Sequence, residues 1–187
     1  MFAVTPLRTD TIYLLRHAES VGHGLDDGLT EAGQAAAEAI VPQLEALEID
    51  GIFSSPAARA KQTARPLADK LDLAVSVMPD LREHRLSMSG HDPEDPMLEL
   101  RFSQRAKARP GGESFNAAAS RLRQACAAIA RRPVIAPLFV THGGLMASVI
   151  SQLDKTYGFA EFQTMPRPAL YKITHAKGMP RKIEALT

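Results

Sequence analysis

The segment 11–15 constrains the fold of this chain most strongly. It reads Thr-Ile-Tyr-Leu-Leu, an apolar run without polar alternation. Strands covered on both faces of a parallel sheet have this pattern, whereas a strand with one face in water alternates between apolar and polar residues. The segment therefore predicts a central strand in a sheet that carries helices on both faces.

Strand and helix patterns alternate along the rest of the chain. Short apolar runs that predict strands lie at 51–54, 73–78 and 134–140. Patterns that predict helices run from Thr30 to about Glu48, from Ser55 to about Leu71, from Glu113 to Arg131 and from Leu145 to Leu153. Segments 169–174 and 182–185 predict a pair at the sheet edge, joined through Lys177-Gly178. This order predicts a three-layer α/β/α sandwich with a mostly parallel sheet.

Two of these helices have local start signals. Thr30 is a residue type that caps helix N-termini, because its hydroxyl accepts a hydrogen bond from a free backbone amide. Ser55 followed by Pro56 predicts a cap and a first-turn proline for the next helix. The segment from Arg85 to Pro110 is polar and interrupted by glycine and prolines, which predicts a lid.

Length and composition exclude several classes of protein. The chain has 187 residues, which predicts a single domain over 1–187, because domains cluster near ~100–150 residues. Its 22 Lys and Arg against 21 Asp and Glu give no global attraction to nucleic acid or to anionic membranes. One cysteine, Cys126, excludes an internal disulfide, and no segment approaches the ~18 apolar residues of a membrane span. We expect a cytoplasmic protein, and the sequence leaves its oligomeric state open.

Three of the predicted strands end in residues that suit an oxyanion. These residues are Arg16 and His17, then Ser54 and Ser55 with Arg59 close behind, and then His142 and Gly143. Because the carboxyl ends of parallel strands meet at one edge of a sheet, we expect these groups to lie together. Two arginines, two histidines and the free amides of helix N-termini form a donor-rich pocket for a tetrahedral oxyanion.

His17 is the candidate nucleophile in this set. A histidine accepts a phosphoryl group when one ring nitrogen is free and the other donates to a backbone carbonyl. Neighbouring arginines keep the ring neutral and stabilise the transferring phosphoryl group, so this chemistry requires no metal or other cofactor. The leaving oxygen needs a proton, for which Glu83 is the candidate acid, with Asp92 and Glu94 as fallbacks.

Each of these residues also has a simpler interpretation. A single histidine after a buried strand is more often structural than catalytic. Arg16 and Arg59 would then be surface arginines paired with Glu19 and Asp69. His142 before two glycines is also typical of a turn, because glycine adopts positive φ without strain.

Five motifs occur in the order found in a known family. They lie at 15–20, 29–33, 54–64, 111–114 and 140–144. With them the chain resembles the histidine phosphatase superfamily, in its phosphoglycerate mutase-like branch, from residue 12 to about 150. The resemblance implies that His17 is the phosphorylated nucleophile and that Glu83 is the acid. It further implies that the phosphoryl group is held by Arg16, Arg59, His142 and Gly143.

Three positions depart from family patterns. His23 stands where the family commonly has an asparagine that contacts phosphate, so a titratable ring replaces one donor. The residues after Glu83 lack the glycine and the aromatic that usually follow the acid. Gly143 occupies the place of an aspartate in the acid phosphatase and phytase branch, which disfavours that branch.

The residues and the resemblance together predict a metal-independent phosphomonoesterase that acts on a small phosphorylated substrate. A phosphoglycerate mutase is the first alternative, but only 27 residues, 84 to 110, separate Glu83 from Gly111, and a short lid favours hydrolysis. A protein-phosphohistidine phosphatase and a non-catalytic phosphate-binding module also remain open. The basic residues of the lid suit either a second anionic group or a solvated face: Arg101, Arg105, Lys107 and Arg109.

Overall fold

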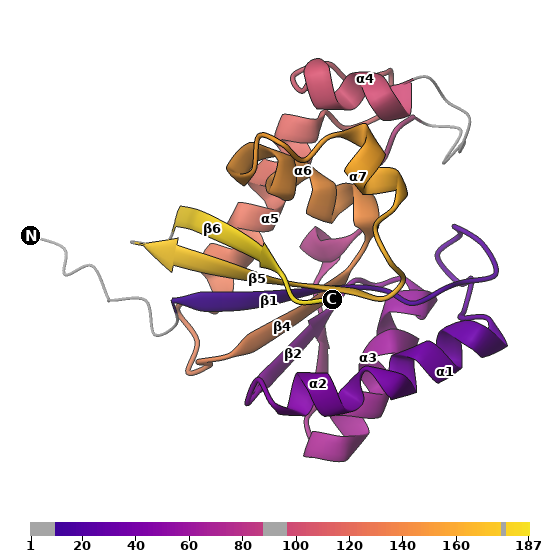
Figure 1. The fold of residues 1–187 in the computed structure, drawn as a ribbon, viewed down its shortest axis with the longest axis vertical. Helices are drawn as coiled ribbons and strands as arrows, with labels where there is room; N and C mark the ends of the chain where they lie inside the picture. The colour runs from indigo at the N-terminus through magenta and orange to yellow at the C-terminus, as the bar shows by residue number, and fades with distance from the viewer. Residues whose placement is uncertain (1–9, 88–96, 177–178) are drawn as a thin grey trace, which may run out of the picture.

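The computed structural model describes residues 10–87, 97–176 and 179–187. These residues form one six-stranded sheet with helices on both faces (Figure 1). The strands are β1 (Thr11–Arg16), β2 (Gly51–Ser54), β3 (Val75–Val77), β4 (Pro137–Thr141), β5 (Ala169–Ala176) and β6 (Met179–Ala185). Their order is β3-β2-β4-β1-β5-β6, which confirms the predicted α/β sandwich.

The sheet is parallel in one half and antiparallel in the other. β3, β2, β4 and β1 run parallel, whereas β5 is antiparallel to β1 and β6 is antiparallel to β5. Arg16 is paired with Thr141, and Ser54 with Val140, so β1, β4 and β2 end at one edge. This register brings the polar residues that follow the three strands to a common place.

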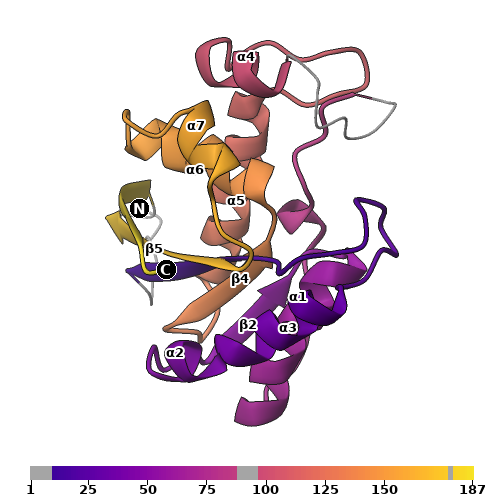
Figure 2. The same cartoon turned by 45° about the vertical axis from the view of Figure 1, so that its right-hand side comes forward.

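Two groups of helices cover the sheet. They are α1 (Glu31–Ala39), α2 (Val41–Glu45), α3 (Ala58–Leu71), α4 (Met97–Ser103), α5 (Phe115–Ile129), α6 (Gly143–Leu153) and α7 (Phe159–Gln163), with a short 3-10 helix at Pro79–Leu81. Helices α1, α2 and α3 lie on one face, and α5 and α6 lie on the other (Figures 1 and 2). Helix α4 lies beyond α5 and α6, farthest from the sheet (Figure 2).

Strand β1 contributes to two hydrophobic cores. Ile12 and Leu14 belong to the core under α5 and α6, whereas Tyr13 and Leu15 belong to the core under α1 to α3. Leu14 and Leu15 are both fully buried. The strand is therefore central, as predicted from its unbroken apolar pattern, and truncating either leucine to alanine would cost about 2–5 kcal/mol.

The predicted helix from Thr30 to Glu48 is two helices in the structure. Thr30 caps α1 as predicted, because its Oγ1 accepts from the Gly33 amide at 2.9 Å. Helix α1 ends at Ala39, and α2 begins at Val41 with Pro42 in its first turn. Proline has no amide hydrogen to continue a helical ladder, so the chain restarts a helix at this point.

The predicted cap at Ser55-Pro56 is wrong. Helix α3 begins at Ala58 with Ala57 as the N-cap residue, and it ends at Leu71 as predicted. The Ser55 hydroxyl accepts from the Ala57 amide at 3.3 Å and also contacts a histidine ring of the site. Strand β3 is shorter than the predicted 73–78, and α7 was not predicted.

The two glycines after His142 are helical. Helix α6 begins at Gly143, two residues before the predicted start, with His142 at the N-cap position. Among the described glycines, positive φ occurs at Gly111, with φ 71. The interpretation of His142 as a turn residue followed by positive-φ glycines is therefore wrong.

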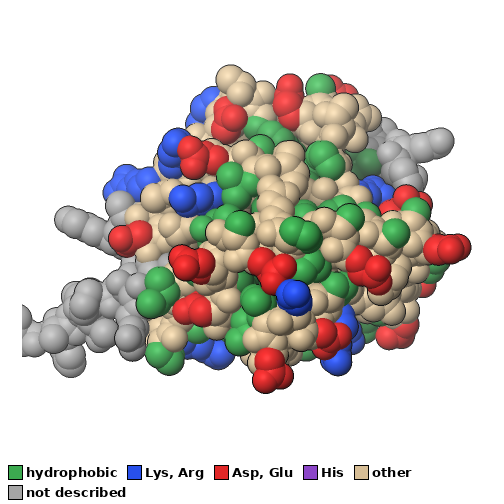
Figure 3. All heavy atoms as spheres, turned by 60° about the horizontal axis from the view of Figure 1, so that its bottom comes forward, with side chains coloured by type: hydrophobic (Ala, Val, Ile, Leu, Met, Phe, Trp, Pro, Cys, Tyr) green, Lys and Arg blue, Asp and Glu red, His purple; other side chains and the backbone are tan. Residues whose placement is uncertain are grey.

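The predicted lid contains helix α4, and its residues 88–96 lie outside the described part of the chain. Among the described helices, none combines the length and apolarity needed to cross a membrane. The face formed by α1, α2 and α3 carries acidic and basic side chains scattered among apolar ones (Figure 3). No broad basic patch is visible on that face.

Candidate active site

A cavity of about 290 Å³ lies at the edge where β1, β2 and β4 end. One side of it, which we call the phosphate end, is lined by Arg16, His17, His23, Arg59, Glu83 and Gly143. The opposite side, which we call the outer wall, is lined by Leu98, Phe159, Phe162, Gln163 and Arg167. The structure therefore brings six of the seven predicted site residues to one cavity.

His17 is 5% exposed and has a defined tautomer. Its Nδ1 lies 2.7 Å from the Ala18 carbonyl oxygen, and because a carbonyl only accepts, Nδ1 carries the proton. Nε2 then has the free lone pair and accepts from Nε of Arg59 at 3.2 Å. Burial lowers the pKa of His17 to about 3, and His142 and Arg59 act in the same direction. The ring is thus neutral near pH 7, with Nε2 as a nucleophilic atom.

Arg59 enters the site from the first turn of α3 and is 4% exposed. Besides its bond to His17, it donates through Nη1 to the Gly24 carbonyl at 2.6 Å and through Nη2 to Nδ1 of His142 at 3.3 Å. Asp69, the surface partner that the sequence also allowed, pairs with Arg65 instead. Arg59 is therefore a buried group of the site.

Arg16 is also buried, at 6% exposure, so it is not the surface arginine of the alternative interpretation. Its Nη1 donates to the Met165 carbonyl at 2.5 Å and to the Pro166 carbonyl at 3.4 Å. Its Nε has no hydrogen-bond partner among the described residues. A Cβ on Gly143 would lie 3.0 Å from that nitrogen, so a glycine at this position lets the guanidinium pack against the start of α6.

His142 lies behind the cavity rather than on its surface. It is fully buried, and its ring centroid is 5.0 Å from that of His17. Because Arg59 donates to Nδ1, Nε2 carries the proton and donates to Oγ of Ser55 at 2.7 Å. Burial lowers the pKa of His142 to about 4. The neutral ring holds Arg59 and packs against His17, and it is the predicted site residue that the cavity does not expose.

Glu83 lines the cavity and accepts three backbone hydrogen bonds. They come from the amides of His84 at 2.6 Å, Gly144 at 3.2 Å and Leu145 at 2.9 Å, the last two in the first turn of α6. A Cβ on Gly144 would lie 2.7 Å from Oε1, so the glycine permits this approach. Burial raises the pKa of Glu83, but His142 and the amides of His84 and Gly144 outweigh it and lower the pKa to about 2. Glu83 is ionised near pH 7 when no ligand is bound.

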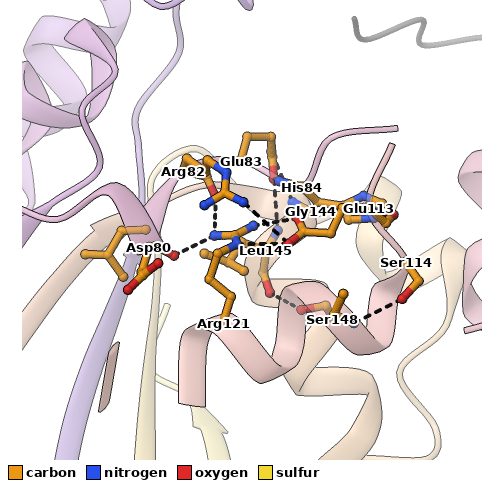
Figure 4. A network of polar contacts seen from close by, with 12 residues as sticks. Asp80, Arg82, Glu83, His84, Glu113, Ser114, Arg121, Gly144, Leu145 and Ser148 are labelled. Atoms are coloured by element: carbon orange, nitrogen blue, oxygen red, sulfur yellow. Dashed lines mark hydrogen bonds and ion pairs between the residues drawn. The ribbon is translucent and has the colours of Figure 1, made fainter. Parts of the chain in front are cut away.

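An ion pair supports the segment that carries Glu83 (Figure 4). Arg121 on α5 donates to both carboxylate oxygens of Glu113, at 2.9 and 2.7 Å. Its Nη1 also donates to the carbonyls of Asp80, at 2.5 Å, and Arg82, at 3.0 Å. The pair therefore fixes the backbone directly before Glu83, and Glu113 has a structural role in it.

His23 is exposed and lines the cavity. Burial lowers its pKa, and the charges of Arg59 and Arg167 lower it further. A phosphate contact of this ring stays a prediction. The fallback acids Asp92 and Glu94 lie outside the described residues.

Thr63 is a supporting residue that sequence reasoning missed. Its hydroxyl accepts from the Ala18 amide at 3.0 Å and donates to the Arg59 carbonyl at 2.7 Å. It thereby ties the residue after His17 to helix α3. Its position one turn after Arg59, four residues on, is the signal that could have found it.

The outer wall was also missed by sequence reasoning. Its side chains come from α4, from α7 and from the segment that follows α7. The available signal was a local concentration of aromatics at Tyr157, Phe159 and Phe162, in a chain whose aromatic content is 5%. Phe102 of α4 packs on both phenylalanines, with ring centroids 6.2 and 5.9 Å away.

The basic residues of the predicted lid do not form one solvated face. Arg101 is 4% exposed, and its guanidinium lies 4.5 Å from the Phe162 ring centroid. Arg105 donates to the Ser151 carbonyl at 2.5 Å. Lys107 and Arg109 are exposed. The solvated interpretation is thus wrong for Arg101, and none of these four residues lines the cavity.

Comparisons with known proteins identify the family of the chain. The model of the histidine phosphatase superfamily (branch 1) matches residues 12–183. A probable phosphoglycerate mutase, GpmB, of Yersinia pestis is 28% identical over 158 residues, which are 76% of this chain and 74% of that protein. A mycobacterial glucosyl-3-phosphoglycerate phosphatase in complex with inorganic phosphate is 26% identical over 96% of each chain, with a TM-score of 0.73. A structure titled mycobacterial hydrolase 1 is 25% identical over 96% of this chain and 98% of that one, with a TM-score of 0.72.

The chain therefore belongs to branch 1 of the histidine phosphatase superfamily and is an enzyme of the histidine phosphatase class. Among residues 10–87, 97–176 and 179–187, no three His, Cys, Asp or Glu side chains are grouped so that they could hold a metal ion.

Proposed function

We propose that the protein is a metal-independent phosphomonoesterase that hydrolyses small phosphate esters through a phosphohistidine on His17. The observation that carries the proposal is the state of His17. Its ring is neutral, Nδ1 is fixed as the donor to Ala18, and Nε2 faces Arg59 at the phosphate end. A nucleophile that needs no deprotonation, beside a guanidinium that binds phosphate oxygens, suits attack on phosphorus.

In the first step, Nε2 of His17 attacks phosphorus in line with the ester oxygen. The N–P bond forms, the P–O bond to the alcohol breaks, and the electron pair leaves with the oxygen. Arg16 and Arg59, which both line the cavity, neutralise the charge on the transferring oxygens. The leaving oxygen takes a proton from the carboxyl group of Glu83.

The proton on Glu83 enters with the substrate. Glu83 is ionised before binding, since its pKa is about 2. A phosphate monoester has its second pKa near ~6, so near pH 7 a fraction of it arrives as the monoanion. A phosphate group placed beside the carboxylate raises the pKa of Glu83, which lets that proton pass to the acid.

In the second step, water attacks the phosphohistidine. Glu83, now a carboxylate, accepts the proton of that water, the N–P bond breaks, and Nε2 regains its lone pair. Glu83 then passes this proton to the product, which leaves as the phosphate monoanion, and the carboxylate of the resting enzyme is restored. One carboxyl group thus serves as acid and then as base.

Hydrolysis is favoured over mutase activity. One solved phosphatase superimposes on this chain over 96% of both chains. The short segment of 27 residues, 84 to 110, between Glu83 and Gly111 also supports a site that water enters. A cytoplasmic location remains a prediction from composition.

The test is hydrolysis of 4-nitrophenyl phosphate by the wild type and by His17→Ala, with and without a chelator. We expect chelator-resistant hydrolysis that His17→Ala abolishes, while its thermal unfolding shows that the variant remains folded. Hydrolysis that survives in His17→Ala, or that the chelator removes, would overturn the proposal. Isomerisation of 3-phosphoglycerate, assayed in parallel, would assign a mutase. Phosphate binding without turnover would assign a binding module.

A further inference from the structure

Arg167 lies at the cavity because Arg16 holds the segment before it. The carbonyls of Met165 and Pro166 both accept from Nη1 of Arg16, and Ala169 is the β5 residue paired with Arg16 of β1. Arg167 stands between these two anchor points and lines the cavity. Its place is therefore set by the same arginine that faces the phosphate end.

The Arg167 guanidinium is exposed and has no ion-pair partner among the described residues. Glu83, the carboxylate that lines the same cavity, is already held by the amides of α6. The charge of Arg167 reaches the phosphate end, since it lowers the pKa of Arg16 and of His23. A cation in this position is available to a ligand.

In the reactive complex, the arginines at the cavity carry one more positive charge than the bound phosphate offsets. Three arginines line the cavity among the described residues: Arg16, Arg59 and Arg167. A bound phosphate dianion offsets about two of their charges, and Glu83 must be protonated to supply the leaving group. The ring of His17 is neutral. One positive charge is thus unmatched, and Arg167 is the exposed one of the three arginines, whereas Arg16 and Arg59 are buried.

The wall between the two ends is apolar. Leu98, Phe159 and Phe162 line it, and Arg101 fixes the Phe162 ring from the side of α4. A substrate whose phosphate lies at His17 therefore has hydrophobic surface, the Gln163 amide and the Arg167 guanidinium available to its alcohol part. The hydrophobic surface accepts a flat or aliphatic spacer, and Arg167 is the charged group of this wall.

We infer that Arg167 binds a second anionic group, a carboxylate, on the alcohol part of the substrate. The planar guanidinium matches the two oxygens of a carboxylate, and an apolar spacer fills the outer wall. The inference rests on the proposed function for its substrate class, and it makes Arg167 a residue that determines specificity. It assigns the second-anion contact to Arg167 rather than to the basic residues of the lid segment.

The test compares matched esters on matched variants. We would measure kcat/KM for phenyl phosphate and for 3- and 4-carboxyphenyl phosphate with the wild type, Arg167→Gln and Arg65→Gln. We expect the wild type to prefer a carboxylated ester by about 10–100-fold, because a hydrogen bond to a charged group contributes that much. Arg167→Gln should remove this preference. Arg65→Gln, at an exposed pair with Asp69 far from the site, should keep it.

Calorimetry separates this inference from the proposed function. Benzylphosphonate and 3-carboxybenzylphosphonate bind without reacting, so their affinity ratio reports on Arg167 even if no ester is hydrolysed. A tighter carboxylated ligand in the wild type, with the difference lost in Arg167→Gln, supports the inference. Equal affinities and equal kcat/KM values for the plain and carboxylated compounds overturn it, as does a preference that survives in Arg167→Gln.

Discussion

The phosphate end and the outer wall of one cavity are built in different ways. At the phosphate end, Arg16, His17 and Arg59 are each at most 6% exposed and are held by hydrogen bonds to fixed partners. On the outer wall, Phe159 and Phe162 are partly buried, are held by ring packing, and lead to an exposed Arg167. The difference indicates that the reaction is set by hydrogen-bonded side chains at the rim of the sheet, whereas substrate choice is set by packed rings and by an arginine whose segment is held by Arg16.

The largest expected effect comes from the acid at the phosphate end. Glu83→Gln keeps one carbonyl oxygen for the amides of His84 and Leu145, which share Oε1, and loses only the acceptor of the longer bond from Gly144, so α6 should remain in place. It removes the proton transfer, and kcat for an alkyl phosphate should fall by about 10²–10⁴-fold. A nitrophenyl ester should lose less in its first step, because its leaving group needs no proton.

Values of kcat/KM for the two esters measure this difference, because they report on the first step and not on the attack of water. An equal loss of kcat/KM for the two esters, or no loss for either, would show that Glu83 does not donate the proton. Activity lost together with thermal stability would instead assign Glu83 a structural role at the start of α6.

The second effect is a pH dependence of stability that arises at the phosphate end. The pKa values of His17 and His142 in the folded protein are about 3 and about 4, below the ordinary 6.5. At pH values between the folded-state pKa values and 6.5, the two histidines are protonated in the unfolded chain and neutral in the folded one. The free energy of unfolding therefore falls as pH drops from about 6.5 toward 4. Glu83, with its lowered pKa, adds a further loss below its ordinary 4.5.

Denaturant unfolding at a series of pH values from about 7 to about 5 checks this dependence. His142→Asn, which removes one of the buried rings, should show a shallower loss than the wild type. A wild-type stability that stays constant over this range would contradict the neutral, buried state assigned to both rings.

A smaller effect is expected at Thr63, which joins His17 to α3. Thr63→Val preserves the shape of the side chain but leaves the Ala18 amide without its acceptor. Leaving one buried donor unsatisfied costs about 1–3 kcal/mol of unfolding free energy. Thr164→Val is the matched control, because that hydroxyl is exposed and bonds only to carbonyls of its own helix turn. Equal small losses of unfolding free energy in both variants would show that the hydrogen bond from the Ala18 amide to Thr63 does not stabilise the protein.

The smallest effect is expected on the outer wall, from Arg101→Met. Nε and Nη2 of Arg101 are buried with no partner among the described residues, and removing such a cation relieves a desolvation cost. The loss of its contact with Phe162 costs about 0.5–2 kcal/mol, so the two changes nearly cancel. Thermal unfolding should move little. A large loss of stability would show that the outer wall requires Arg101, as the phosphate end requires its buried arginines.

The phosphate end could be predicted from the sequence because its residues sit at strand ends. Each of Arg16, His17 and His142 follows an apolar run, and parallel strands place such positions on one rim. The resemblance based on the order of the motifs implied that Glu83 is the acid of the same site. Burial of His142 behind the cavity could not be predicted, because it depends on the contact of its ring with Ser55 across two strands.

The outer wall could not be predicted for a related reason. Helix α7 has five residues and no apolar periodicity to detect, and its partners on α4 are some 60 residues away in the sequence, Phe102 against Phe162. Arg167 carries no local signal at all, since its place follows from hydrogen bonds between Arg16 and the preceding carbonyls. Long-range packing of this kind is visible only in the fold.

The most direct test of the account is to find the phosphoryl group during turnover. The enzyme is mixed with an aryl phosphate, quenched in base because the N–P bond is acid-labile, digested, and examined by mass spectrometry. The account predicts one phosphoryl group on the peptide that contains His17, absent in His17→Ala and increased in Glu83→Gln, which slows the attack of water. A phosphoryl group on Ser55, or hydrolysis that proceeds with His17 never modified, would contradict it.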